Sequence, residues 1–232
     1  NILKNRISDS DNGVGLIGVG AANGRFTALV QDNVLEDIGG IEILATLSSL
    51  SDVNLTIDGN TFRDDASTLA ANILNITNNL ALHITGNLFQ RGGIATAIVG
   101  PAGNDLEVDL SDNQFLAGPA GSVLQFVLAG AVGRDLRLAV DGNYMENGLA
   151  VLSLAPVGRN SAVSFSGNTL LNSPGGALTL ISSTVGGNAI LRLDNNGIIS
   201  PSGAGMTVLL PPLIGNDLYL SASGNYIADA LG

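Results

Sequence analysis

The sequence predicts an all-β solenoid, a chain wound into about eight to nine stacked coils of about 27 residues each. Three observations predict it. An asparagine recurs at a nearly constant interval, an alternating apolar segment precedes most of these asparagines, and a large apolar residue follows each one two positions later. A fixed repeat of about 20 to 50 residues is typical of solenoids, because one repeat buries its apolar face only against its neighbours. We therefore expect a single domain, residues 1–232, without evident capping elements.

The recurring asparagines lie 25 to 30 residues apart, and most follow a glycine or an aspartate. Gly and Asn tolerate left-handed backbone, so each pair predicts a sharp turn. When such turns stack in register, the Asn amides can bond to one another along the solenoid axis. We predict that the asparagines after Asn5 form a structural ladder. They are Asn33, Asn60, Asn87, Asn113, Asn143, Asn168, Asn196 and Asn225.

The segment before each asparagine predicts a half-buried strand, because apolar and polar residues alternate with a period of two. Positions five and three before the asparagine are apolar in nearly every repeat, as in Leu55 and Ile57 or Leu82 and Ile84. The residue two positions after the asparagine is expected to point inward again. These residues are Leu35, Phe62, Phe89, Phe115, Met145, Leu170, Ile198 and Ile227.

A second apolar segment, such as 94–99 or 123–128, precedes each of these units and ends at a turn such as 103–106. Each coil is therefore expected to hold two longer strands, one short strand, two tight turns and one variable loop, for example 63–67 or 116–121. Parallel connections of this kind predict a right-handed path. Segment 123–128 is apolar on both faces, which indicates that another surface covers one outer face of the solenoid.

The repeated unit apolar-x-apolar-x-Gly-Asn-x-Phe, seen at 55–62 and 82–89, resembles that of the right-handed parallel β-helix superfamily. Its members include pectate-lyase-like enzymes, phage tailspikes and bacterial surface proteins. The resemblance covers nearly the whole chain and implies the architecture. It implies no single activity, because the superfamily contains lyases, hydrolases, epimerases, adhesins and structural rods.

Composition and charge exclude several classes of protein. The net charge of −11, from 20 acidic and 9 basic residues, disfavours nucleic acid as a partner, since binding to phosphates needs a basic face. The apolar segments are far shorter than the roughly 18 residues of a membrane-spanning helix. The absence of cysteine excludes disulfides and thiolate metal sites, and suits a secreted bacterial solenoid. An extracellular or cell-surface location is expected.

One cluster invites a search for chemistry. The expected register puts His83 beside Asp109 and Glu107 beside Arg137 on an outer face. Such groups can transfer protons, and carboxylates can bind calcium, but opposite charges on neighbouring strands are also ordinary sheet stabilisation. The Gly-His-Gly motif of pectin hydrolases and the Arg-x-Pro-x-x-Arg motif of pectate lyases, which the resemblance would imply for these activities, are absent. The prediction is no catalytic residue, no metal and no cofactor, with calcium as the alternative.

The expected function is a non-catalytic extracellular structural protein, a β-helical rod that associates with itself end to end into a fibre or forms part of a cell-surface stalk. The chain starts and stops at nearly the same phase of its repeat, at 1–7 and 224–232, so a second copy would continue the helix. One alternative is a polysaccharide lyase or hydrolase that uses the cluster around His83. Another is an adhesin passenger segment whose variable loops bind a glycan or a cell.

Overall fold

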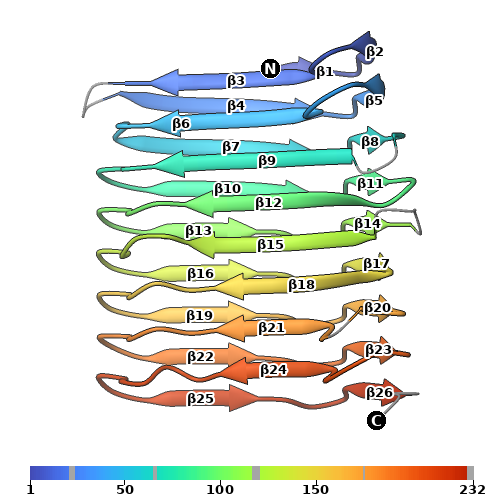
Figure 1. The fold of residues 1–232 in the computed structure, drawn as a ribbon. Helices are drawn as coiled ribbons and strands as arrows, with labels where there is room; N and C mark the ends of the chain where they lie inside the picture. The colour runs from blue at the N-terminus through green and yellow to red at the C-terminus, as the bar shows by residue number, and fades with distance from the viewer. Residues whose placement is uncertain (21–23, 65–66, 117–120, 175, 229–232) are drawn as a thin grey trace.

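The computed structural model describes residues 1–20, 24–64, 67–116, 121–174 and 176–228. All regular elements in these ranges are β-strands, and every strand pairing is parallel. The strands form three sheets that extend along the whole molecule, two of nine strands and one of eight (Figure 1). The predicted all-β parallel solenoid is confirmed, with about eight complete coils.

Each coil contributes one strand to each sheet, in the order C, A, B. Sheet A consists of β1 (Ile2–Leu3), β4 (Arg25–Gln31), β7 (Asp52–Asp58), β10 (Leu80–Thr85), β13 (Leu106–Asp109), β16 (Leu136–Ala139), β19 (Ser161–Ser164), β22 (Ala189–Arg192) and β25 (Leu218–Ser221). Sheet B consists of β2 (Arg6–Ser10), β5 (Val34–Ile38), β8 (Thr61–Phe62), β11 (Leu88–Phe89), β14 (Gln114–Phe115), β17 (Tyr144–Glu146), β20 (Thr169–Leu171), β23 (Gly197–Ile199) and β26 (Tyr226–Ala228). Sheet C consists of β3 (Val14–Val19), β6 (Ile43–Ser48), β9 (Ser67–Leu74), β12 (Gly93–Val99), β15 (Ser122–Leu128), β18 (Gly148–Ser153), β21 (Leu178–Ile181) and β24 (Met206–Leu209).

The path of the chain is right-handed. In Figure 1 the strands of sheet C run to the left in front, those of sheet A run to the right behind them, and the chain descends from N to C. This handedness is the one expected for parallel strands joined by crossover connections. Two of the predicted variable loops, 63–67 and 116–121, join sheet B to sheet C, and residues 65–66 and 117–120 within them lie outside the described residues.

The core is built from continuous files of side chains, one from each coil. Leu55, Leu82, Val108 and Leu138 are direct partners in successive strands of sheet A, and all four are buried. In sheet B the rings of Phe62, Phe89 and Phe115 stack with centroids 4.4 Å apart and planes 6° from parallel. Because each side chain lies over its equivalent in the next coil, the apolar interior is continuous along the axis.

A left-handed residue precedes every ladder asparagine at the corner between sheets A and B. Its φ lies between 55° and 68° in all nine coils, and the residue is glycine in five of them: Lys4, Asp32, Gly59, Gly86, Asp112, Gly142, Gly167, Asn195 and Gly224. Glycine adopts this backbone without steric cost, and Asp and Asn adopt it at a lower cost than other residues. The sharp turn predicted from the Gly-Asn pairs is confirmed.

The corner between sheets C and A carries a further buried file that the sequence pattern did not reveal. From Ile76 to Ile214, single parallel bridges join one residue of a coil to the equivalent residue of the next, and most of these residues are buried aliphatics. They are Ile76, Ala102, Val132, Val157, Val185 and Ile214. This file closes the apolar interior at the corner between sheets C and A.

Candidate functional site: the outer face of sheet A

The outer face of sheet A carries the four residues predicted as a cluster. His83 in β10 is the direct partner of Asp109 in β13, and Glu107 in β13 is the direct partner of Arg137 in β16. All four alternate with buried leucine or valine residues, so they share the outward face across three coils. The register therefore brings them side by side.

The four side chains are neighbours but are not joined to one another. No hydrogen bond or ion pair links His83 to Asp109 or Glu107 to Arg137 in the described structure, and Oδ1 of Asp109 is buried without a hydrogen-bond partner. A general base acts on a proton that lies within hydrogen-bond reach. In this arrangement the cluster holds charges of both signs on a flat surface, without a connected proton-transfer pair.

Shallow hollows lie along the same face, because small side chains alternate with large ones between neighbouring coils. Ala81, Ala139 and Ala162 contribute to the hollows, and Glu107 and Arg137 stand beside them. The three hollows measure about 450, 490 and 450 Å³. They are open to solvent along one side, so they form a surface furrow more than an enclosed pocket.

At the edge of this face lies the asparagine ladder, which occupies the corner between sheets A and B. Nδ2 of Asn60 donates to Oδ1 of Asn87 at 3.0 Å, and Nδ2 of Asn87 donates to Oδ1 of Asn113 at 3.1 Å. The main-chain N–H of each of these residues donates to the same oxygen of the next coil. The same two bonds recur between every successive pair of the series Asn5, Asn33, Asn60, Asn87, Asn113, Asn143, Asn168, Asn196 and Asn225.

The inner asparagines also bind the main chain of the preceding coil. Nδ2 of Asn113 donates to the carbonyl of Ile84 at 2.8 Å, and Nδ2 of Asn87 donates to the carbonyl of Ile57 at 2.9 Å. From Asn33 to Asn196 these side chains are at most 1% exposed. A buried amide is tolerated only when its donors and acceptors are paired, and here both ends are. The ladder is therefore a structural element that joins every coil to the next.

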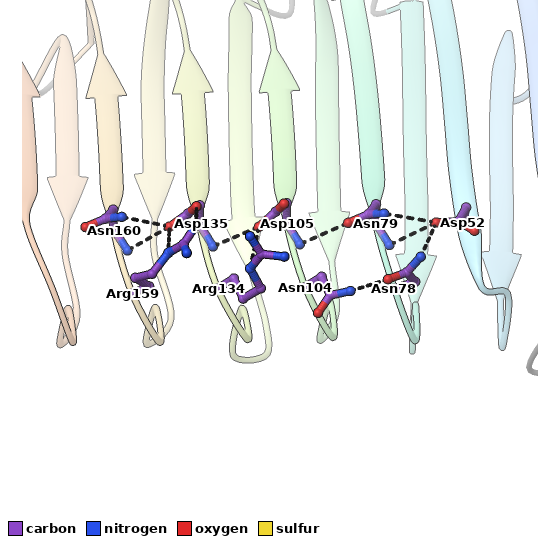
Figure 2. A network of polar contacts seen from close by, with 9 residues as sticks. All are labelled: Asp52, Asn78, Asn79, Asn104, Asp105, Arg134, Asp135, Arg159 and Asn160. Carbon is purple, nitrogen blue, oxygen red and sulfur yellow. Dashed lines mark hydrogen bonds and ion pairs between the residues drawn. The ribbon is translucent and has the colours of Figure 1, made fainter.

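A second side-chain ladder lies at the other edge of the face, where the strands of sheet A begin (Figure 2). The N–H of Asp135 donates to Oδ1 of Asp105, and the N–H of Asn160 donates to Oδ1 of Asp135 at 3.1 Å. The same bond continues to Asn188 and to Asp217. In this ladder each main-chain N–H donates to the side chain of the preceding coil, whereas in the asparagine ladder it donates to the side chain of the next coil.

Arginines neutralise several carboxylates of this second ladder. Arg159 binds both carboxylate oxygens of Asp135, and Arg134 lies 3.6 Å from Asp105. The hydrogen bond from Arg159, together with those from Asn160, holds the pKa of Asp135 well below its usual range. Asp52, at the start of the second ladder, accepts a hydrogen bond from Ser51 and others from Asn78 and Asn79, and these bonds lower its pKa. These contacts allow carboxylates of adjacent coils to stack in spite of their like charge.

The sequence reasoning recognised the turns that hold this ladder but not the ladder itself. The signal was present as an Asn or Asp that recurs at the start of sheet A strands from Asp52 to Asp217, for example in Asn104-Asp105 and Arg134-Asp135. A further outward row, two positions before each ladder asparagine, contains Asp58, Asp141 and Asp194 together with Thr85, Ser111, Ser166 and Ser223. Thr85 donates to Oδ1 of Asp58 at 2.8 Å, and Ser223 donates to Oδ1 of Asp194 at 3.0 Å.

One buried carboxylate lies apart from both ladders. Glu42, just before β6, is 1% exposed, and its Oε2 accepts the main-chain N–H of Thr68 in the next coil. Burial raises the pKa of Glu42 above its ordinary value. This residue has no equivalent in the repeat pattern, and the sequence analysis did not single it out.

These features define a class of protein, a parallel β-solenoid whose coils are joined by two polar side-chain ladders. No family model, curated protein or solved structure matches the chain. Within the described ranges, no group of three or more His, Asp or Glu residues is placed to hold a metal ion. The same ranges contain no helix long and apolar enough to cross a membrane.

Proposed function

We propose that this chain is a non-catalytic structural protein of the extracellular space or the cell surface, a β-helical rod that associates with itself end to end. The observation that supports this most strongly is the repeated pattern of contacts between successive coils. The three sheets and the asparagine ladder extend along the whole molecule, and the second ladder runs from Asp52 to Asp217. Such an array is stabilised by each coil that is added, including the coils of a second copy.

The two end coils carry complementary groups. Among the described residues, Oδ1 of Asn5 accepts no hydrogen bond, whereas the N–H of Asn225 donates none. These two groups match each other as the amides of any two successive coils do, so the Asn5 coil of a second copy fits the face of the Asn225 coil. Leu220 and Ile227 of the last coil are 47% and 46% exposed and would be covered by the same contact. A head-to-tail contact of this type is heterologous and extends without closing.

Electron microscopy and sedimentation velocity of the purified chain at neutral pH test the proposal. We expect rods whose length grows with protein concentration, with the strands perpendicular to the long axis. A Leu220→Lys variant places a charge on the end surface of the core and should shorten these rods. The matched control is Tyr219→Lys in the same strand, where the side chain already points outward and is 59% exposed. Dispersed single molecules at high concentration would contradict end-to-end association.

The extracellular setting of the proposal is supported by the resemblance of the repeat unit to that of secreted β-helical proteins, and the absence of cysteine is compatible with it. Fractionation of the source cells, with protease treatment of intact cells, tests it. A chain that is protected from protease until the cells are lysed would contradict a surface location.

A second candidate function, cleavage of acidic polysaccharides, is favoured by one observation. His83, Asp109, Glu107 and Arg137 share one outer face next to the hollows described above. A turnover assay on a panel of acidic polysaccharides, with and without calcium, tests this function. Product release that is lost in Arg137→Ala but kept in Arg192→Ala would support it, and no release from any substrate would exclude it for that panel.

A further inference from the structure

The outer face of sheet C differs from every other face of the molecule in its charge. None of its eight strands contains Asp, Glu, Lys, Arg or His. The strands of sheets A and B, in contrast, include outward residues such as Asp58, Glu107 and Glu36. The chain has a net charge of −11 and 29 charged residues, 9 basic and 20 acidic, yet the strands of one whole sheet carry none.

The outward side chains of sheet C are uncharged, and aliphatic residues lie among Ser, Thr, Asn and Gln residues. One file of direct partners runs through Thr46, Asn72, Ile98, Val127, Ser153 and Ile181. Away from the two end strands, Leu74, Ile94 and Ile181 are still 40%, 39% and 40% exposed. Sheet C lies in front in Figure 1, and no described segment covers it. A charge-free face with exposed aliphatic side chains is typical of a contact with another molecule.

We propose that sheet C is a lateral interface on which a second copy of this chain packs face to face. Charge favours a second copy over other occupants. Two molecules with a net charge of −11 repel each other wherever their acidic faces meet. At sheet C they can approach without bringing like charges together. A contact of like surface with like surface is the isologous type that a two-fold axis produces.

The dimensions of the face suit such a contact. Eight strands about 4.8 Å apart span about 34 Å, and strands of about six residues extend about 20 Å, so the flat footprint is about 680 Å². A standard interface buries about 800 Å² of accessible surface per partner, and a surface of projecting side chains exceeds its flat footprint. Two sheets that pack face to face lie about 10 Å apart, with the side chains of the two inner faces interdigitated. Sheet C is therefore large enough for a stable dimer.

The proposal is independent of end-to-end association, and the two predict different masses. A two-fold contact closes, so lateral pairing gives a mass twice that of the chain, whereas end-to-end stacking gives a series without an upper limit. Analytical ultracentrifugation of the purified chain over a range of concentrations distinguishes them. We expect a dimer, or rods of double width if both contacts form.

Two adjacent strands of one coil offer a matched pair of variants. Ile181 in β21 points outward from sheet C and is 40% exposed, and Ile190 in β22 points outward from sheet A and is 36% exposed. Ile181→Glu should raise the dimer dissociation constant at least about tenfold, because the two-fold axis buries the new charge twice. Ile190→Glu should leave the dissociation constant unchanged.

A third variant distinguishes loss of the interface from loss of the folded state. Ser153→Glu changes a residue that is already polar and pairs with Ile181, so we expect native stability together with loss of the dimer. Circular dichroism checks the fold of each variant. A wild-type chain that stays monomeric at all concentrations overturns the proposal. Equal dissociation of the Ile181 and Ile190 variants, or oligomers that only Leu220→Lys disrupts, also overturns it.

Discussion

Replacing Asn113 by aspartate tests whether the asparagine ladder holds the coils together. Aspartate has the same shape, so packing is unchanged and only hydrogen-bond polarity and charge differ. Oδ1 of Asn113 accepts from the N–H and from Nδ2 of Asn87, both at 3.1 Å, and aspartate retains this acceptor. Nδ2 of Asn113 donates to the carbonyls of Ile84 and Ser111 and to Oδ1 of Asn143, at 2.8, 3.1 and 3.2 Å. A carboxylate oxygen at this position donates to none of these three oxygens.

The loss follows from the number of bonds removed. Nδ2 carries two hydrogens, one of them shared between two of these acceptors, so about two hydrogen bonds of about 1 kcal/mol net each are lost. Burying a charge beside the unpaired oxygens costs at least about 1 kcal/mol more, so we expect a total loss of about 3 kcal/mol. For a chain of this length, about 3 kcal/mol corresponds to a fall in Tm of roughly 6–12 °C. Urea denaturation followed by circular dichroism measures the change in the free energy of unfolding.

The pH dependence of the variant provides a second measurement. The buried carboxyl of Asp at position 113 has a raised pKa, so protonation stabilises the folded state, and a protonated carboxyl regains one donor. The deficit of the variant relative to wild type should therefore shrink as the pH falls below neutral. Asn188→Asp is the control, because Asn188 is exposed and equivalent positions in the second ladder are already aspartate. We expect the control to change stability by less than about 0.5 kcal/mol. Equal losses in both variants, or a deficit that does not vary with pH, would refute a structural role for the ladder amides.

Three further predictions concern the corner, the core and the buried acid. Gly86→Ala should cost about 1–2 kcal/mol, because the φ of Gly86 is 62° and its new Cβ would lie 3.2 Å from Oδ1 of Asp58. The control Gly15→Ala has open space around it and should be neutral in the same urea titration. Phe89→Ala should cost about 3–5 kcal/mol, since the ring is fully buried and stacked on both sides, whereas a loss as small as that of Tyr219→Ala would contradict the stacked core. Glu42→Gln should stabilise the chain at neutral pH. Because the pKa of Glu42 is raised in the folded state, the wild type should lose stability as the pH rises from about 4.5 through that raised pKa. Unfolding curves measured across this pH range should show no such loss in the variant. A wild type and variant with parallel pH profiles would show that Glu42 does not titrate in that window.

The features that the sequence predicted correctly have a local physical cause. Alternating side chains place Leu55 and Leu82 inside because successive residues of a strand point to opposite faces. The turn at Gly86 is recognisable because few residues accept its backbone conformation. Repetition then supplies the register, since equal spacing places Leu82 over Leu55 and His83 beside Asp109.

The candidate site was less accessible to this reasoning. Register predicted which residues are neighbours, but it did not predict that His83 and Asp109 share no hydrogen bond, because that depends on side-chain conformation. The second ladder was missed because Asp105 and Asn160 differ in charge and sit in turns of different composition. Glu42 was missed because its partner, the N–H of Thr68, belongs to another coil and has no sequence signature.

From its sequence alone, this protein is a stack of coils with an apolar interior and an asparagine at one corner of each coil. These properties depend on the alternation and backbone preference of neighbouring residues, which the order of amino acids contains directly. The tertiary structure decided which oxygens accept which donors between coils. It also showed that the charges gather on two sheets while the third has none, because the faces of a solenoid are assembled from residues about 27 positions apart.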